Sequence, residues 1–185
     1  MRLFVAVDIS EAIGTAIEDA QKQLHQAGAG VAWVKPGNLH LTLKFLGDTP
    51  EARLNDVKSA LDLVAPQHAA FDMKVYDLGC FPDRGAPRVV WAGVTAGREQ
   101  LTALAAAVDK SLSELGFPRE MRLFVAHLTL GRVRSPRGAD RLRKRIEELA
   151  GADFGICRVE AMRLYQSTLA PGGSVYSVVH SAGLK

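Results

Sequence analysis

The tetrapeptide His-Leu-Thr-Leu occurs twice in this chain of 185 residues, beginning at His40 and at His127. The two copies are 127 − 40 = 87 positions apart, which is close to half the length of the chain. Because side chains alternate across a β-strand, His40 and Thr42 share one face and the leucines share the other. His127 and Thr129 repeat this arrangement. A single pair of this kind is usually a satisfied polar pair at a sheet surface, but its repetition predicts two lobes with related half-sites.

Two histidines and two threonines suit acid–base catalysis on a phosphate ester. A neutral imidazole takes a proton from water and an imidazolium gives one to a leaving oxygen, and an unperturbed pKa of about 6.5 allows both near neutral pH. Threonine hydroxyls hydrogen-bond non-bridging phosphate oxygens. In-line opening of a phosphodiester needs an acid and a base on opposite sides of phosphorus. We therefore expect His40 and His127 to be catalytic, and Thr42 and Thr129 to bind phosphate, in one site between the lobes.

Other catalytic chemistries fit the sequence less well. Carboxylates or cysteines that would complete a zinc site beside the two motifs are not evident, and threonine is not a usual zinc ligand. The Gly-x-Ser-x-Gly turn of serine hydrolases is missing. So are the glycine loops of nucleoside triphosphate and dinucleotide sites. We therefore expect neither a metal ion nor a cofactor.

Short strands and amphipathic helices alternate along the chain. Strands are expected at residues 2–8, 31–34, 40–46, 71–78, 88–94, within 122–133, at 154–165 and at 175–179. Helices are expected from Ser10 to about Gly28, from Pro50 to Pro66, over the leucine stripe of 101–115, and at 142–149. The strands are short and several are joined by turns, including a loop at 79–87 and a turn at 171–173. We expect one bilobal α+β domain over residues 1–185, with two antiparallel sheets related by a pseudo-twofold axis and helices outside.

A second peptide also occurs twice, but its spacing differs from that of the two His-Leu-Thr-Leu copies. The pentapeptide Arg-Leu-Phe-Val-Ala occupies residues 2–6 and again 122–126. Its distance from the following His-Leu-Thr-Leu differs between the two copies, so we interpret this echo as chance.

The overall composition is that of an ordinary globular protein. Hydrophobic residues make up 48% of the chain and charged residues 23%, with a formal net charge of +3. This mild basicity is compatible with an anionic ligand such as RNA. No apolar run approaches the ~20 residues of a membrane span, and no signal peptide is evident, so we expect a cytoplasmic protein. Cys80 and Cys157 lie far apart and are expected to be buried free thiols.

Several further residues have two interpretations. A basic cluster follows the second motif, and it is either a solvated helix face or a track for an RNA backbone. Four aromatic residues either stack on a base or pack in the core. Three histidines outside the motifs are expected to have surface or structural roles. The basic cluster is Arg132, Arg134, Arg137, Arg141, Arg143, Lys144 and Arg145, the aromatic residues are Trp33, Phe45, Phe81 and Tyr165, and the histidines are His25, His68 and His180. Arg132 is a separate candidate, because its place further along the motif strand puts it near the face of His127 and Thr129.

The chain resembles the two-histidine (HxTx) phosphoesterases. Within them it is most similar to the bacterial and archaeal RNA 2′,3′-cyclic phosphodiesterases, also known as 2′-5′ RNA ligases. The resemblance runs essentially end to end. Two HxTx motifs in this setting are a specific signal, whereas one alone would not be. The matching segments are RLFVAVD at 2–8, WVKPGNLHLTLKFLG at 33–47, GCFPDRGAPRVVWAGV at 79–94, HLTLGR at 127–132 and PGGSVY at 171–176.

The resemblance implies a role for each motif residue. His40 would be the proton donor and His127 the proton acceptor. Thr42 and Thr129 would bind the phosphate, with Arg132 as a further contact. The family fold is bilobal, with a cleft between the lobes. The usual proline before the second histidine is Ala126 here, which leaves His127 and Thr129 in place.

The expected activity is metal-independent hydrolysis of RNA 2′,3′-cyclic phosphate ends to 2′-phosphate ends. The expected partner is an RNA with such an end or a small cyclic nucleotide, bound by a monomer. One alternative is 2′-5′ RNA ligation, which would use the same site in reverse. Another is a module that binds nucleotide or RNA without turnover, although binding alone would not require an acid–base pair.

Overall fold

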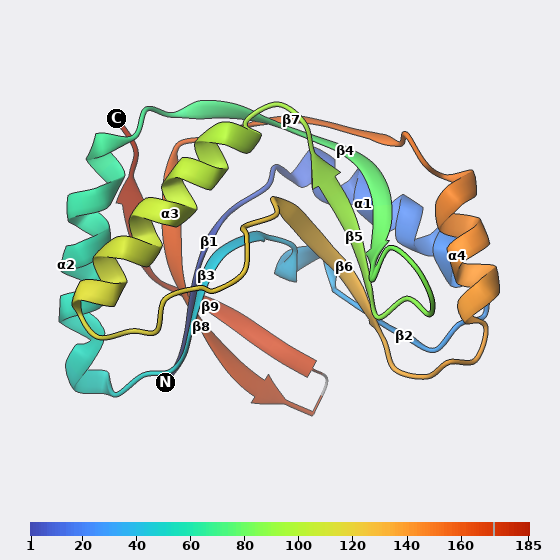
Figure 1. Ribbon diagram of the computed structural model, residues 1–185, viewed down its shortest axis with the longest axis horizontal. Coiled ribbons are helices and arrows are strands. Elements are labelled where there is room, and N and C mark those ends of the chain that lie inside the picture. Colours follow the sequence, from blue (N-terminus) through green and yellow to red (C-terminus); the bar gives the residue numbers. More distant parts are fainter. Residues whose placement is uncertain (172) are drawn as a thin grey trace.

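The structure, a computed structural model, describes residues 1–171 and 173–185, and these residues form two antiparallel sheets (Figure 1). The first sheet has the strand order β3 (Leu41–Asp48), β1 (Arg2–Val7), β8 (Ala161–Ala170) and β9 (Gly173–Gly183). The second has the order β2 (Val31–Trp33), β6 (His127–Val133), β5 (Val89–Val94), β4 (Phe71–Phe81) and β7 (Asp153–Val159). The expected α+β class with two antiparallel sheets is confirmed.

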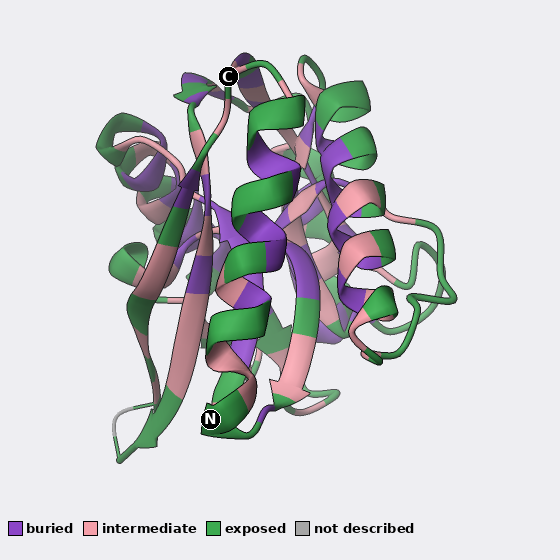
Figure 2. Ribbon diagram, turned by 90° about the vertical axis from the view of Figure 1, so that its left-hand side faces the viewer, coloured by how far each residue is buried: buried purple, intermediate pink, exposed green. Residues whose placement is uncertain are grey.

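Two helices belong to each sheet. Helices α2 (Leu54–Val64) and α3 (Arg98–Glu114) pack with the first sheet, and we call this assembly the first lobe. Helices α1 (Glu11–His25) and α4 (Ala139–Glu148) pack with the second sheet and form the second lobe with it. The helix residues that face the sheets are buried and those on the outer side are exposed (Figure 2).

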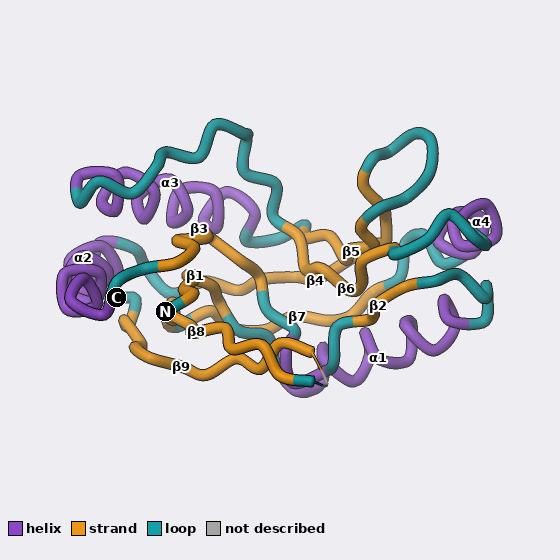
Figure 3. The backbone as a smooth tube through the Cα atoms, turned by 90° about the horizontal axis from the view of Figure 1, so that it is seen from below, coloured by secondary structure: helices purple, strands orange, loops and turns teal. Residues whose placement is uncertain are grey.

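The two lobes are not the two halves of the chain. Strand β1 belongs to the first lobe, but α1, which follows it, lies along the second sheet (Figure 3). In the same way β5 belongs to the second lobe, but α3, which follows it, packs on α2 and β3 of the first. Each half of the chain therefore supplies one helix to the lobe that carries the other half's motif.

Helix α1 illustrates how the sequence sets these elements. The Ser10 hydroxyl caps the helix by accepting a 3.3 Å hydrogen bond from the backbone N–H of Ile13. Ile13, Ile17 and Leu24 lie on one face at helical spacing and are buried against the second lobe. Burial of each such side chain contributes roughly 1.5–3 kcal/mol, so this stripe holds the helix on the sheet.

The element boundaries differ from the expected ones at several places. Strand β4 continues to Phe81, inside the segment expected to be a loop. Residues 122–126 are not a strand, because β6 begins only at His127, which agrees with the interpretation of the repeated Arg-Leu-Phe-Val-Ala as chance. The strand expected at 154–165 is divided between β7 and β8, which lie in different sheets. The strand expected at 175–179 is part of β9, which forms a long hairpin with β8, and Gly172 of the expected turn lies outside the described residues.

The structure also shows the state of the two cysteines and the character of the helices. Cys80 and Cys157 are buried free thiols, as expected. Within the described ranges, none of the helices combines the length and the apolar character that crossing a membrane requires.

Candidate active site

The strands that carry the two motifs meet where the lobes join. His40 directly precedes β3, and His127 is the first residue of β6. Strands β3 and β6 contact each other although they belong to different sheets, near the centre of the molecule (Figure 1). The fold thus brings together the two sequence motifs that are half a chain apart.

Both histidines are held in the same tautomer by the backbone. The Nδ1 atom of His40 lies 2.8 Å from the carbonyl oxygen of Asn38, and that of His127 lies 2.7 Å from the carbonyl oxygen of Val125. Because a carbonyl oxygen only accepts, each Nδ1 must carry the hydrogen and donate it. In the neutral ring, Nε2 is then the atom that exchanges protons. The Nε2 atom of His40 is 3.1 Å from the hydroxyl oxygen of Thr42 in the same motif.

His40 lies in an aromatic cluster on the face of the first sheet that the helices leave uncovered. The Phe4 ring stacks on its imidazole at 4.7 Å between centroids, and Tyr176 meets it edge-on at 5.3 Å. Burial in this cluster lowers the pKa of His40 below its ordinary value of 6.5, while the Asn38 carbonyl and the charge of Asp8 act in the opposite direction. The net effect favours the neutral imidazole.

Asp8 lies at the edge of this cluster and is itself held by two partners. The Tyr165 hydroxyl donates a hydrogen bond to one carboxylate oxygen, and the Arg163 Nε atom lies 2.9 Å from the other. Burial and the hydrogen bond to Asp8 raise the pKa of Tyr165, so its phenol stays a donor. These two contacts fix the position of the Asp8 carboxylate near His40.

His127 has different neighbours in the second sheet. Its ring meets Phe81 edge-on at 5.2 Å, and Phe81 lies 5.4 Å from Trp91. Trp91 is paired directly with Thr129 across β5 and β6. Gly79 allows this arrangement, because a Cβ atom there would lie 2.2 Å from the indole ring of Trp91.

Each motif strand contains a β-bulge at the leucine that follows its threonine. In the first sheet Thr42 pairs with Ala6 and Lys44 with Val5, so Leu43 is the extra residue. A bulge shifts the alternation by one residue. As a result Lys44 points to the helices, where its Nζ atom lies 2.6 Å from Asp109 of α3.

The second bulge determines where Arg132 points. Thr129 pairs with Trp91 and Gly131 with Val90, so Leu130 is the extra residue. Strict alternation would place Arg132 on the face opposite Thr129, but the bulge returns it to the side of Thr129. Its position opposite Val89, in a strand that alternates regularly, confirms this side. Among the described residues, the Arg132 side chain has no hydrogen bond or ion pair, and it is exposed.

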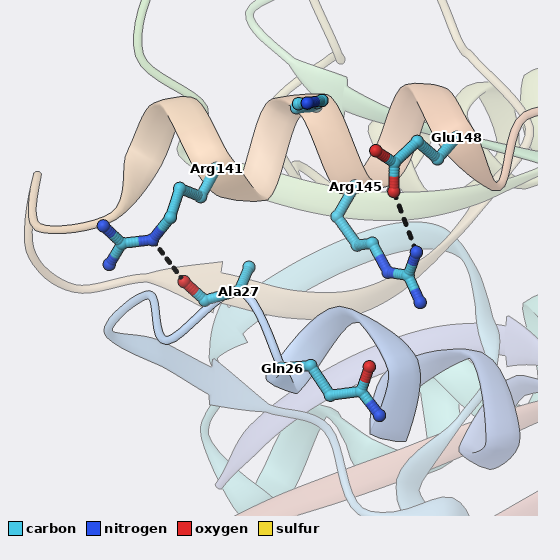
Figure 4. Close-up of a pocket in the computed structure, with 6 residues that line it drawn as sticks. Gln26, Ala27, Arg141, Arg145 and Glu148 are labelled. Atoms are coloured by element: carbon cyan, nitrogen blue, oxygen red, sulfur yellow. Dashed lines mark hydrogen bonds and ion pairs between the residues drawn. The ribbon is translucent and has the colours of Figure 1, made fainter.

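Three arginines of the basic cluster have intramolecular partners. Arg143 of α4 donates to backbone carbonyls of the loop after β4, including that of Asp83 at 2.8 Å. Figure 4 shows Arg141 and Arg145 in a pocket of about 410 Å³ between the end of α1 and α4. Arg141 donates to the carbonyl of Ala27 at 2.9 Å, and Arg145 pairs with Glu148 at 2.8 Å. These contacts favour the structural interpretation for these three residues.

The other sequence candidates have mixed surroundings. Phe45 is 67% exposed and lies 6.0 Å from Phe4 by ring centroids, whereas Trp33 packs over Gly131. His180 is hydrogen-bonded to Asp62 at 2.7 Å. Within the described ranges, no group of three His, Cys, Asp or Glu side chains is placed to hold a metal ion.

The sequence did not single out Phe4, Trp91 and Tyr176, which lie beside the motifs. Phe4 stands among the apolar residues 3–7 of β1, where the sequence does not show which face of the strand is covered by helices. Its alternate position in that strand was the one available signal.

Comparisons with known proteins agree with this geometry. The model of the LigT-like phosphoesterase family matches the chain twice, at residues 7–91 and 93–176. The chain is 43% identical to the RNA 2′,3′-cyclic phosphodiesterase of Archaeoglobus fulgidus over 95% of this chain and 96% of that protein. It is 38% identical to the protein of the same name from Methanocaldococcus jannaschii, over 97% of this chain and 98% of that protein.

Solved structures show the same fold. A crystal structure of a Thermus thermophilus protein matches with a TM-score of 0.84 and 32% identity, over 100% of this chain and 98% of that one. Escherichia coli LigT in complex with 3′-AMP matches with a TM-score of 0.75 and 27% identity, over 99% of this chain and 97% of that one. The two family matches meet between the β5 residues Trp91 and Gly93. Together with the two antiparallel sheets and the paired histidine motifs, they show that the chain belongs to the LigT-like phosphoesterase family.

Proposed function

We propose that this protein hydrolyses the 2′,3′-cyclic phosphodiester at an RNA end and leaves a 2′-phosphomonoester. The observation that carries the proposal is the matched pair of histidines on contacting strands, each with Nδ1 tied to a backbone carbonyl and Nε2 left for proton transfer. The relatives named RNA 2′,3′-cyclic phosphodiesterase support the same activity. Escherichia coli LigT, a structural relative, forms a complex with 3′-AMP, a ribonucleotide with phosphate on the ribose, which supports a nucleotide as the ligand of this fold.

The proposed reaction moves one proton at each histidine. His127 Nε2 accepts a proton from water as the water oxygen bonds to phosphorus. His40, in its charged form, donates its Nε2 proton to the 3′-oxygen as the bond between that oxygen and phosphorus breaks. Exchange of protons with solvent then restores both rings. Thr42 and Thr129 hydrogen-bond the non-bridging oxygens, and Arg132 offsets their charge.

We further propose that residues 1–185 act as one unit, as a monomer in the cytoplasm, and that the reaction needs no metal ion. Interchange of helices between the lobes supports the single unit, because neither lobe is complete with one half of the chain. The acid–base pair supplies both proton transfers, which supports activity without a metal.

The test is to incubate the protein with a short RNA ending in a 2′,3′-cyclic phosphate, in the presence of EDTA, and to identify the products by phosphorus NMR. A 2′-phosphate end supports the proposal. A 3′-phosphate end would reverse the roles of His40 and His127. A 2′-5′ linkage to an added 5′-hydroxyl RNA would identify a ligase, and unchanged RNA that stays bound would identify a binding module. Activity that is lost with EDTA and restored by a divalent ion would overturn metal independence.

A further inference from the structure

Gln21 is a polar residue buried in the apolar stripe of α1. It is 6% exposed, and its neighbours on that helix face include Ile17 and Leu24. A buried amide is costly unless it is hydrogen-bonded. Its Nε2 atom donates to the carbonyl oxygen of Leu130 at 2.9 Å and to that of Val34 at 2.9 Å. The side chain thus reaches from the helix to two backbone segments of the second lobe.

The Leu130 carbonyl belongs to the extra residue of the bulge in β6. It also accepts a 2.8 Å hydrogen bond from the backbone N–H of Val34, just after β2. Gln21 therefore joins the bulge to the chain beside it and fixes both against α1. Leu130 is left out only of the pairing with β5, while its carbonyl accepts from Val34 on the side of β2, so the second hydrogen bond from Gln21 holds the bulged residue from outside the sheet.

We propose that Gln21 is a positioning residue that holds the bulge at Leu130, so that Arg132 lies on the same side as Thr129. If β6 lost this bulge, alternation would turn Arg132 toward the helices and away from the motif residues. Gln21 touches no reacting group, and its effect passes through the backbone. This proposal rests on the role proposed above for Arg132.

Among the residues that the structure describes, the first lobe shows no counterpart of this contact. The position equivalent to Gln21, 21 + 87 = 108, is Val108, which is buried in α3. There the neighbouring residue Asp109 reaches the motif strand through Lys44. Position 44 + 87 = 131 in the second lobe is Gly131, which has no side chain to offer. The two lobes therefore tie the motif strand to its helix with different residues, an amide in the second lobe and an ion pair in the first.

The decisive variant is Gln21→Met, which keeps the length of the side chain and removes both donors. Gln23→Met is the matched control, because Gln23 lies on the exposed face of the same helix. For Gln21→Met we expect kcat/KM on a cyclic-phosphate RNA to fall about 10- to 100-fold, the scale of a misplaced contact group. In an Arg132→Ala background, Gln21→Met should lower kcat/KM little further. The control Gln23→Met should leave kcat/KM unchanged in both backgrounds.

A merely structural role gives a different result. It would lower the melting temperature of Gln21→Met but leave kcat and KM of the folded protein unchanged, and this outcome would overturn the proposal. An equal additional loss in the Arg132→Ala background would also overturn it. A crystal structure of Gln21→Met gives a readout that does not depend on the reaction. We expect the pairing of Gly131 with Val90 to be lost, and an unchanged bulge would refute the inference even if the proposed function failed.

Discussion

Phe45 and Arg132 occupy equivalent positions, each five residues after a motif histidine, and a bulge in each strand turns both toward the side of the motif threonines. One lobe thus presents an exposed aromatic ring where the other presents an exposed guanidinium group. The proposed phosphate site has two similar halves, but the surfaces beside it differ. A ring binds a base by stacking and a guanidinium group binds a phosphate, so the asymmetry can orient a nucleotide between the lobes.

Replacing these two residues should have separable effects. Phe45→Ala removes a stacking surface, for which we expect KM for a cyclic mononucleotide to rise by roughly 5- to 100-fold, corresponding to about 1–3 kcal/mol per stacked base. Arg132→Ala should weaken binding most at low salt, because ionic contacts are screened as ionic strength rises. Phe45→Tyr is the control and should keep KM near its original value. The measurement is steady-state kinetics at two salt concentrations, and equal salt dependence of both alanine variants would contradict the assignment.

Loss of either motif histidine should abolish most of the activity. We expect His40→Ala and His127→Ala each to reduce kcat by at least ~10²-fold, the usual effect of a positioned acid or base. The fold should persist, because buried leucines on the opposite strand faces carry the packing. His25→Ala, at the exposed end of α1, is the control. Near-normal turnover in either motif variant would contradict the two-histidine mechanism.

The pH dependence of activity should reflect the surroundings of His40. Burial lowers its pKa below 6.5, and the acid form is required, so kcat/KM should decline with rising pH from below pH 6.5. Asp8 acts to raise this pKa, and Asp8→Asn should therefore move the alkaline limb to still lower pH. The two limbs of the pH profile reflect both histidines together, so the informative quantity is the shift of the alkaline limb in Asp8→Asn and not its absolute position.

Asp72→Asn, at an exposed site on β4, is the control for the pH profile and should leave it in place. An alkaline limb that stays unchanged in Asp8→Asn, or that moves to higher pH, would show that Asp8 does not act on His40.

The buried ion pair of the first lobe should be sensitive to the loss of one partner. Lys44 and Asp109 have side chains only 5% and 13% exposed. Removing Asp109 leaves the Lys44 ammonium group buried, so Asp109→Ala should lower the free energy of unfolding by about 3–5 kcal/mol. The double variant Asp109→Leu with Lys44→Met should recover most of that loss. Chemical denaturation measures both, and a double variant as unstable as the single one would argue against an uncompensated charge.

The exposed pair of Arg158 and Asp72 is the comparison for this measurement. Its side chains are 52% and 64% exposed, so Asp72→Ala should change the free energy of unfolding by at most about 1 kcal/mol.

The buried ion pair of Lys44 and Asp109 should also make the stability of the protein depend on pH in acid. Burial opposes the charge of Asp109, but Lys44, the N–H of Glu120 and Arg119 outweigh it and hold the pKa of Asp109 below 3.8. The unfolded chain therefore binds a proton there before the folded one does, so the stabilisation is complete above about pH 3.8 and is lost as the pH falls further. As the pH falls below that value, the free energy of unfolding of the wild type should decrease relative to that of the double variant, which lacks the carboxylate. Parallel curves down to pH 2 would exclude this contribution.

Much of the architecture could be predicted because it depends on short-range patterns. The repeated His-Leu-Thr-Leu predicted two related motif strands, which the structure brings into contact, and periodicity located the helices and most strands. Periodicity could not show that α1 and α3 exchange lobes, because an apolar stripe does not specify which sheet it covers. The face of Arg132 could not be derived from alternation either, since the bulge at Leu130 exists only in the pairing with β5. The sequence pattern could not single out Gln21, because it is an isolated amide in a helix. Its hydrogen bond to Leu130 reaches a strand more than a hundred residues away in the sequence.

The exchange of α1 and α3 gives the molecule the architecture of a domain-swapped dimer joined into a single polypeptide. A half-length chain would leave its own motif strand without the covering helix, and only a second copy could supply it. Two half-length chains would have to exchange these helices to cover both motif strands. In one polypeptide the two halves need not be identical, and Phe45 and Arg132 can stand at equivalent positions.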